Sequence, residues 1–244
     1  MAKHVIFLNL IMFLMVSWAS AQPSRVIFLG ESHTSESDHA GQLEVLKSLE
    51  GAPLILAAEM FTSRSERALM ELTETPLSEE LWKQEWGHPY ELYAPIWEWA
   101  VGRVQIAPLR PDPSFTKRVK EGGPAVAVAE IDTLLLGPEP YRQSLSEIFA
   151  AHLPPDQEMS DEMLNSYFLI QCFWDEYMAW RISRLADQYP EHRIAVLVGY
   201  GHLHPEFGIP ARLKRPRPDL RYVNIAFSEE RRELCDLLWT LRER

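Results

Sequence analysis

The chain has 244 residues, a formal net charge of −11 and only two cysteines. This length suits the core of one α/β domain, and the negative charge makes nucleic acid and anionic membranes poor partners. Two cysteines are too few for a fold held together by disulfides.

Residues 1–21 have the pattern of a secretory signal peptide. The apolar run Val5–Trp18 is followed by the small residues Ala19-Ser20-Ala21, which match the small-x-small rule for cleavage. The run is shorter than the roughly 20 residues that cross a bilayer, and an uncleaved anchor is the alternative. We expect one mature domain, residues 22–244, that is secreted or periplasmic and has no stable membrane insertion after cleavage.

Short apolar runs alternate with helical patterns along the mature chain. Most runs are continuous rather than alternating, which is typical of parallel strands covered on both faces. The order predicts an α/β fold with a mostly parallel central sheet and helices on both faces. The predicted strands are Arg25–Gly30, Pro53–Ala58, Val104–Leu109, Ala125–Ala129, Arg193–Val198 and Arg221–Ala226, and the predicted helices are Ser37–Leu49, Ser63–Glu71, Ser78–Glu85, Tyr90–Val101, Pro140–Ala151, Asp161–Gln188 and Glu229–Arg242.

Two helical segments, about 77–100 and 140–188, are expected to form a helical cap over the carboxyl edge of the sheet. The first segment is rich in tryptophan and also carries His88, Tyr90 and Tyr93. Tyrosine and histidine are known axial ligands of haem, and neighbouring aromatic rings would contact a porphyrin face. The alternative is an aromatic helical core without a ligand.

Two Gly-x-x-His turns follow apolar runs at opposite ends of the chain. The first turn is Gly30-Glu31-Ser32-His33, and the second is Gly199-Tyr200-Gly201-His202, which continues to His204. The carboxyl ends of parallel strands lie at one edge of a sheet, where α/β proteins place their sites. We therefore expect Glu31, His33, His202 and His204 to meet in one crevice.

Two more carboxylates are candidates for the same site. Glu59 directly follows the apolar run Leu54–Ala58, and a buried carboxylate needs a partner because an unpaired charge is costly. That partner is a metal ion, a histidine or a substrate proton, or else an arginine in an ordinary salt bridge. Asp175 interrupts the apolar stripe of the helix 161–188, so it either orients a histidine or makes a buried hydrogen bond.

These residue types allow two kinds of hydrolytic chemistry. His33, Glu59 and His202 form the two-histidine, one-carboxylate set that is the usual minimum for an open metal site, with a divalent transition metal such as Mn or Zn. In that reading Glu31 is the general base, and His204 or Asp175 orients a group or donates a proton. In the other reading Glu31 and His33 do acid–base work without a metal.

The two cysteines, Cys172 and Cys235, each lie in a largely apolar, helical stretch. We interpret them as two buried thiols. A disulfide between them in an oxidising compartment is the alternative.

Five motifs in order along the chain resemble one family. They are Gly30–His33, Glu59–Phe61, Trp174–Ala179, Gly199–His202 and Gly208–Leu213. Together they resemble the ChaN-like haem-binding proteins of the Tiki/TraB-like superfamily, over nearly the whole mature chain.

The resemblance implies an α/β domain with a helical cap and a role in haem or iron uptake. Haem would lie against the aromatic cap, in one arrangement between the two protomers of a homodimer. The resemblance implies a metal or polar set of His33, Glu59 and His202. It also implies haem ligation by tyrosine with a histidine contribution, for which Tyr93 is the first candidate and His88 and Tyr90 follow.

Two features depart from the pattern. The chain has no lipid-bearing cysteine, and Arg110-Pro111 stands where an Asn-containing turn is expected. The main hypothesis is a haem-binding protein, and the alternative is a Tiki-like metal-dependent hydrolase that acts on a peptide or small ester. A third reading is a metal-free site like that of the distantly similar erythromycin esterases.

Overall fold

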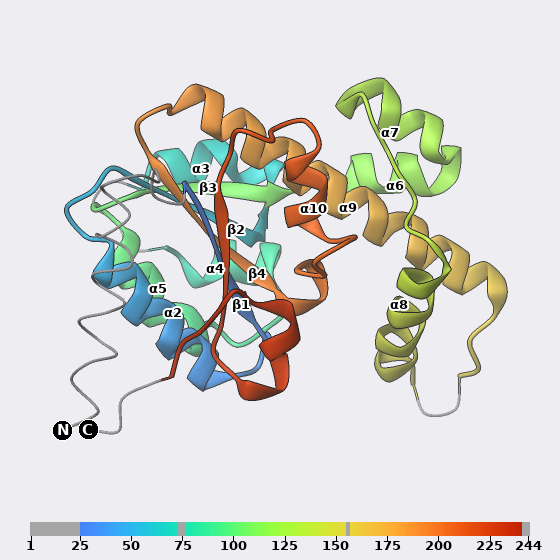
Figure 1. Cartoon of the computed structure of the whole chain (residues 1–244), viewed down its shortest axis with the longest axis horizontal. Helices are drawn as coiled ribbons and strands as arrows, with labels where there is room; N and C mark the ends of the chain where they lie inside the picture. Colours follow the sequence, from blue (N-terminus) through green and yellow to red (C-terminus); the bar gives the residue numbers. More distant parts are fainter. Residues whose placement is uncertain (1–24, 73–76, 155–156, 241–244) are drawn as a thin grey trace.

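The computed structural model describes residues 25–72, 77–154 and 157–240. Residues 1–21, for which a signal peptide is predicted, lie outside this part. Within it, one six-stranded sheet has the order β3-β2-β4-β1-β5-β6, and every pair of neighbours is parallel (Figure 1). The strands are β1 (Val26–Glu31), β2 (Leu54–Thr62), β3 (Gln105–Arg110), β4 (Arg193–Gly199), β5 (Tyr222–Ala226) and β6 (Leu237–Leu238).

Helices cover both faces of the sheet, which confirms the predicted fold class. One face packs against α2 (Glu36–Ser48), α3 (Glu66–Met70), α4 (Glu79–Glu85) and α5 (Tyr90–Ala100). The other packs against α10 (Ile209–Lys214) and the C-terminal half of α9 (Asp161–Gln188). Alternate residues of β1 contribute to the two cores, because successive side chains of a strand point to opposite faces. Phe28 lies on the α9 side and Leu29 on the α2 side.

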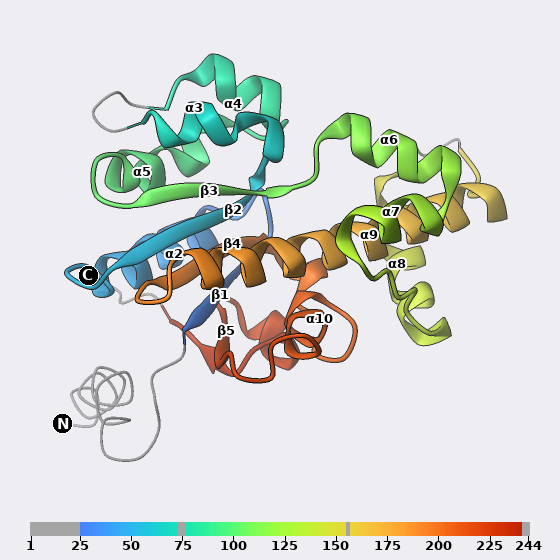
Figure 2. The ribbon, with the colours of Figure 1, turned by 90° about the horizontal axis from the view of Figure 1, so that it is seen from above.

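A helical extension projects beyond the carboxyl ends of the strands (Figure 2). It consists of α6 (Pro113–Gly122), α7 (Pro124–Ile131), α8 (Glu139–His152) and the N-terminal half of α9. Two small apolar clusters attach α6, α7 and α8 to α9. The segment 77–100 lies mostly on the sheet face, since α5 packs beside α2, and its turn at Trp86 and His88 reaches the edge beside His33.

Three short 3-10 helices complete the described secondary structure: Ser63–Ser65, Tyr200–His202 and Glu229–Leu234. The middle one forms the turn that leaves β4 and carries His202.

Two predicted elements are wrong. The stretch Ala125–Ala129 is not a strand but part of α7, which begins with Pro124 in its first turn and buries Ala127 and Ile131 against α9. Proline is well suited to a first helical turn and alanine to a helix interior, so local propensity prevailed over the alternation of Val126 and Val128.

The predicted helix Glu229–Arg242 is the second error. The chain forms a 3-10 helix over Glu229–Leu234 and then the short strand β6, which pairs with β5. The backbone N–H of Asp236 donates to the carbonyl of Asn224, and its carboxylate accepts from the Asn224 N–H at 2.8 Å. These contacts with β5 explain why helical periodicity failed here; residues 241–242 lie outside the described residues.

Both thiols are free: Cys172 is buried as predicted, but Cys235 is partly exposed, so the prediction that it is buried is wrong. In the described ranges, no helix is long and apolar enough to cross a membrane.

Candidate functional site

The ends of three central strands bring the predicted motifs together. Glu31 is the last residue of β1 and pairs in register with Gly199, the last residue of β4. Glu59 lies near the end of β2, on the other side of β4. The Gly-x-x-His turns therefore leave the sheet from adjacent parallel strands, as the sequence predicts.

Glu31 is a buried carboxylate with partners on several sides. His33 Nδ1 lies 2.9 Å from Glu31 Oε1, and the Tyr93 hydroxyl donates to the same oxygen at 2.5 Å. The Gln42 amide donates to Oε2 at 2.9 Å, and His39 Nε2 lies 3.6 Å from that oxygen. Because the carboxylate cannot rotate freely, it fixes the orientation of the His33 ring.

Glu59 and His202 form the second pair. His202 Nε2 lies 3.3 Å from Glu59 Oε1, and the backbone N–H of Gly199 donates to Glu59 Oε2 at 2.7 Å. Neither Arg64 nor Arg67 is the partner of Glu59, since Arg64 pairs with Asp112 and Arg67 with Glu71. Histidine is thus the partner that the buried Glu59 needed.

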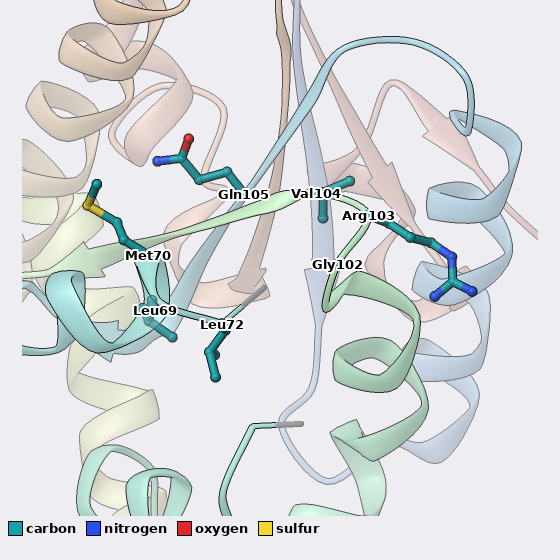
Figure 3. Close-up of a pocket in the computed structure, with 7 residues that line it drawn as sticks. All are labelled: Leu69, Met70, Leu72, Gly102, Arg103, Val104 and Gln105. Atoms are coloured by element: carbon teal, nitrogen blue, oxygen red, sulfur yellow. The ribbon is translucent and has the colours of Figure 1, made fainter. Parts of the chain in front are cut away.

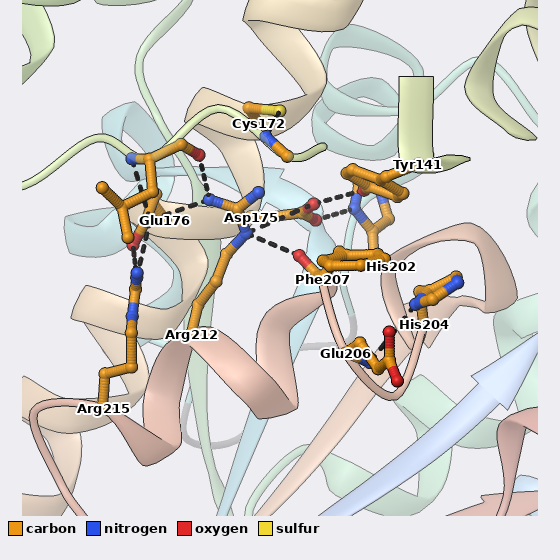
Figure 4. A network of polar contacts seen from close by, with 12 residues as sticks. Tyr141, Cys172, Asp175, Glu176, His202, His204, Glu206, Phe207, Arg212 and Arg215 are labelled. Carbon is orange, nitrogen blue, oxygen red and sulfur yellow. Dashed lines mark hydrogen bonds and ion pairs between the residues drawn. The ribbon is translucent and has the colours of Figure 1, made fainter. Parts of the chain in front are cut away.

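Asp175 reaches the same site from α9 and is fully buried. Its Oδ1 lies 2.6 Å from His202 Nδ1, and its Oδ2 accepts from the Tyr141 hydroxyl at 2.6 Å (Figure 4). Arg212 Nε lies 3.8 Å from Oδ2 and also binds Glu176. Asp175 therefore orients His202, which was one of the two roles considered for it.

The site thus contains two similar units. In each, a buried tyrosine hydroxyl binds a buried carboxylate, which binds the Nδ1 of a histidine. We call them unit A (Tyr93–Glu31–His33) and unit B (Tyr141–Asp175–His202). Glu59 contacts the histidine of unit B and lies close to that of unit A.

The electrostatics of the site keep Glu59 charged. Burial alone would raise the pKa of Glu59, but the neighbouring His202 and His33 hold it well below its usual range. Burial alone would lower the pKa of His202, but Glu59 and Asp175 raise it to about 10. His202 therefore stays an imidazolium at neutral pH, between two carboxylates.

His33 is the accessible member of the site. Its side chain is 31% exposed, whereas that of His202 is 10% exposed. Burial tends to lower the pKa of His33, but Glu31 and Glu59 outweigh it and raise the pKa above the usual value. Its ring packs edge-on against Trp86, with centroids 5.0 Å apart, and near His88 at 5.1 Å.

Gly199 makes room for the His33 ring. A Cβ added there would lie 2.8 Å from His33 Cε1 and 3.1 Å from Nε2, closer than side chains normally approach. We predict that Gly199→Ala displaces His33 and lowers the free energy of unfolding by about 1–3 kcal/mol, the usual range for overpacking. Urea unfolding and the NMR signals of the His33 ring measure the two effects.

The matched control is Gly201→Ala in the same turn, where the nearest atom to an added Cβ is 3.8 Å away. It should leave the free energy of unfolding and the NMR signals of the His33 ring near their wild-type values. Equal effects of the two substitutions would show that the close approach at Gly199 has no consequence.

Arg110 connects the end of β2 to the segment that carries Trp86. Its guanidinium donates to the backbone carbonyls of Glu59, Met60 and Glu85 and lies over the Trp86 ring, 4.7 Å from the centroid. This arginine stands where the family resemblance leads us to expect an Asn-containing turn. It anchors Trp86 beside His33 by direct contacts.

Three further predicted site residues, His204, Tyr90 and Tyr93, make contacts other than the predicted ones. His204 stacks on Phe207 and lies near the Tyr141 ring; its Nδ1 accepts from the Glu206 N–H, so it borders unit B without joining it. The Tyr90 hydroxyl donates to the carbonyl of Leu77. Tyr93 is fully buried, and burial beside Glu31 raises its pKa far above the usual value. Its hydroxyl is held against Glu31 as part of unit A.

The predicted metal set receives no support from the geometry. Among the residues that the structure describes, no three His, Cys, Asp or Glu side chains are arranged to hold a metal ion. His202 uses both ring nitrogens on carboxylates, and His33 uses Nδ1 on Glu31. His33, Glu59 and His202 are together, but as hydrogen-bonded acid–base pairs.

Sequence reasoning missed the residues that hold these pairs in place. Gln42 lies in the second turn of α2, Tyr141 lies in the first turn of α8, and Arg212 belongs to α10. Arg212 belongs to the Gly208–Leu213 motif, so the sequence did contain a signal that this residue is near the site. Gln42 and Tyr141 carried no such signal, because only the tertiary fold places them at the site.

A separate surface pocket of about 350 Å³ lies at the start of β3 (Figure 3). It is formed by the end of α3 and the segment Gly102–Gln105, and contains none of the predicted site residues. The site residues lie at the opposite, carboxyl ends of the strands. This pocket is therefore distinct from the acid–base cluster.

The fold and the cluster define an α/β protein with a polar site at the carboxyl edge of a parallel sheet. The family model described as haem-binding uptake, Tiki superfamily, ChaN, matches residues 17–213. The chain therefore belongs to the ChaN family of the Tiki superfamily, which confirms the resemblance found in its motifs. No curated protein sequence matches the chain.

Solved structures share the fold. A structure described as cofacial haem binding to ChaN of Campylobacter jejuni has a TM-score of 0.66 and 20% identity, covering 84% of this chain and 83% of that one. An erythromycin esterase mutant in its open conformation has a TM-score of 0.54 at 13% identity, covering 90% and 73%. A succinoglycan biosynthesis protein has a TM-score of 0.52 at 15% identity, covering 91% of this chain and 68% of that one. At these identities the likeness establishes the fold alone.

Proposed function

We propose that this protein binds haem and serves haem or iron uptake. The observation that carries the proposal is membership of the ChaN family over residues 17–213. The similar fold of the Campylobacter jejuni ChaN, whose structure is described as binding haem, adds support. The N-terminal pattern of residues 1–21 supports a secreted or periplasmic location.

A haem iron needs an axial donor that it can reach, and this requirement selects Tyr167. Tyrosine is one of the known protein ligands of haem iron. The hydroxyls of Tyr90, Tyr93 and Tyr141 are engaged by other groups. Tyr167 is only partly buried, and its hydroxyl has no hydrogen-bond partner among the described residues.

Tyr167 is also well placed relative to the acid–base cluster. It lies on α9 eight residues before Asp175, so both side chains project from one side of the helix. Burial and the charges of Asp175 and Glu59 raise the pKa of Tyr167 to about 12. Tyr167 also packs against the apolar cluster that contains Tyr141, the tyrosine of unit B.

The surroundings of Tyr167 suit a flat apolar ligand. Its ring stacks on Phe149 of α8, with centroids 4.4 Å apart and planes 13° from parallel. Ile148, its chain neighbour in α8, is 36% exposed, and lies 3.8 Å from the position of a Cβ added at Gly201. An aromatic and aliphatic surface therefore adjoins the free hydroxyl. When bound, haem would supply an iron centre there, and Tyr167 would be its protein ligand.

The test is a Tyr167→Phe substitution, read by absorbance during a hemin titration. We expect the variant to lose the wild-type Soret position, because phenylalanine offers no oxygen to the iron. The matched control is Tyr189→Phe at the far end of α9, where the hydroxyl only accepts from Gln188; its spectrum should equal that of wild type.

A Tyr167→Phe spectrum identical to the wild-type spectrum would remove Tyr167 as the ligand. A further Tyr93→Phe sample separates the candidates. We expect its Soret band to stay in place, since the Tyr93 hydroxyl is buried against Glu31.

A further inference from the structure

We propose that this protein docks on the surface of anionic phospholipid bilayers through a basic and apolar face beside α10. We call it the docking face and define it by six exposed or partly exposed side chains: Leu135, Leu136, Arg184, Lys214, Arg215 and Arg217. The binding is peripheral. It goes beyond haem binding and does not depend on it.

The charge of the chain is unevenly distributed. The whole chain has 24 Lys and Arg residues against 35 Asp and Glu residues, whereas residues 212–221 have five against one. At physiological ionic strength, salt screens exposed charges that lie more than about 8 Å apart. A membrane surface therefore responds to the cations that face it. The net charge of −11, which makes anionic membranes poor partners on average, does not describe this face.

The basic connection is held in place by ion pairs. Residues 214–221 lead from α10 to β5 and lie beside the C-terminal half of α9, on the upper side of the molecule in Figure 1. Arg217 donates to the carbonyl of Ser183 at 3.3 Å and pairs with Asp187 at 2.7 Å. Arg215 pairs with the buried Glu176 at 2.6 Å. Because the connection is already positioned, docking orders little additional chain.

Two cations of the docking face have no carboxylate partner. Lys214 and Arg184 are exposed, and neither makes an ion pair among the described residues. Arg184 lies three residues before Asp187 on α9, so both project from the same side of the helix as the contact with Arg217. Arg215 keeps 38% of its side chain exposed in spite of its partner. These groups can bind phosphate oxygens.

Exposed leucines adjoin the cations. Leu135 and Leu136 are 51% and 49% exposed, whereas large apolar side chains are mostly buried in the described part of the chain. Both line a surface pocket of about 210 Å³ together with Ala211 and Arg215. The Leu135 carbonyl accepts from Arg212 of α10 at 2.7 Å, which fixes the leucines beside the basic connection. Exposed apolar side chains next to cations are typical of surfaces that bind the membrane interface.

A phospholipid surface satisfies both parts of this face. Its phosphates pair with Lys and Arg side chains, and its acyl carbons cover the leucines. An acidic polymer, by contrast, would neutralise the cations and leave the leucines in water. The two leucines therefore favour a bilayer over an acidic protein segment as the partner.

The experiment is sedimentation of the purified mature protein with two kinds of vesicle, because the apolar run Val5–Trp18 of the precursor would itself bind lipid. One kind contains phosphatidylcholine alone, and the other contains equal parts of phosphatidylcholine and phosphatidylglycerol. We expect saturable binding to the mixed vesicles that weakens as salt is raised, and little binding to phosphatidylcholine alone.

Two double variants test the cations and the leucines separately. Lys214→Gln with Arg184→Gln should weaken binding by roughly 25-fold, since each cation near an anionic surface contributes a factor of roughly five. Leu135→Ser with Leu136→Ser should weaken it by roughly tenfold or more at high salt as well as low salt, because the lost contact is apolar.

The matched control is Lys47→Gln with Lys83→Gln, which removes the same charge from the opposite face of the sheet. Both lysines are exposed and lie on α2 and α4. This variant should bind like wild type. Circular dichroism shows that each variant is folded, and the replaced side chains are all exposed.

The proposal is wrong if the wild type does not prefer the mixed vesicles, or if the control variant loses as much binding as Lys214→Gln with Arg184→Gln. It is also wrong if the leucine variant binds like wild type and polyglutamate displaces the vesicles. That last result would assign the face to an acidic protein partner.

Discussion

Replacing Asp175 with alanine should lower the free energy of unfolding by about 3–5 kcal/mol, the range for breaking a buried ion pair. The carboxylate is fully buried and accepts from Tyr141 while it binds His202. Without it, the His202 imidazolium loses one of its two carboxylates and the Tyr141 hydroxyl loses its acceptor. Arg212 also loses its contact at 3.8 Å.

The matched control is Asp187→Ala on the same helix. Asp187 is 57% exposed and pairs with Arg217 at 2.7 Å, and exposed pairs contribute at most about 1 kcal/mol. Urea unfolding at pH 7 should separate the two variants by several kcal/mol. A small change for Asp175→Ala, similar to that of the control, would mean that unit B is not a structural element of the site.

Gly208→Ala should be the second most harmful change. A Cβ at this position would lie 2.7 Å from the His204 backbone nitrogen and closer still to the carbonyl of His202. Because these are backbone atoms, they cannot rotate away as a side chain can. We expect a loss of about 3 kcal/mol, at the upper end of the overpacking range, and a displaced His202 turn.

Gly87→Ala is the control for this prediction, because no atom lies within 4 Å of a Cβ added there. Thermal unfolding should place Gly87→Ala near wild type and Gly208→Ala many degrees lower. Equal midpoints of thermal unfolding for the two variants would show that the backbone can move apart at Gly208 without loss of stability.

The strand ends were predictable because the signal there is local. An apolar run followed by Gly-x-x-His fixes both the strand and the first polar side chain after it, so Glu31, His33 and His202 were assigned to one edge. The charge that interrupts the apolar stripe of α9 identified Asp175 in the same way. In each case, the residues next to the side chain in the sequence are enough to predict where in the fold it lies.

The remaining parts of the site depend on contacts between distant segments. Tyr141 meets Asp175 across 34 residues and Tyr93 meets Glu31 across 62, so neither hydroxyl could be matched to its carboxylate beforehand. The aromatic density of the segment 77–100 pointed to Tyr93 as a ligand. That density arises because α4 and α5 fill the core on one face of the sheet.

The misassigned segments show the same limit. The alternation of Val126 and Val128 resembles a strand, yet helix α7 packs on α9. Helical periodicity after Glu229 was overridden by pairing of β6 with β5. In the first segment, helix propensity and packing on α9 both outweighed the short alternation; in the second, pairing with a neighbouring strand decided the structure.

The central claim is that the chain binds haem, and a hemin titration of the purified mature protein tests it most directly. We predict a saturable Soret shift with a fixed haem-to-protein ratio in the wild type and in the Tyr189→Phe control. A linear, unsaturable absorbance increase, equal to that of hemin mixed with an unrelated protein, would contradict the account.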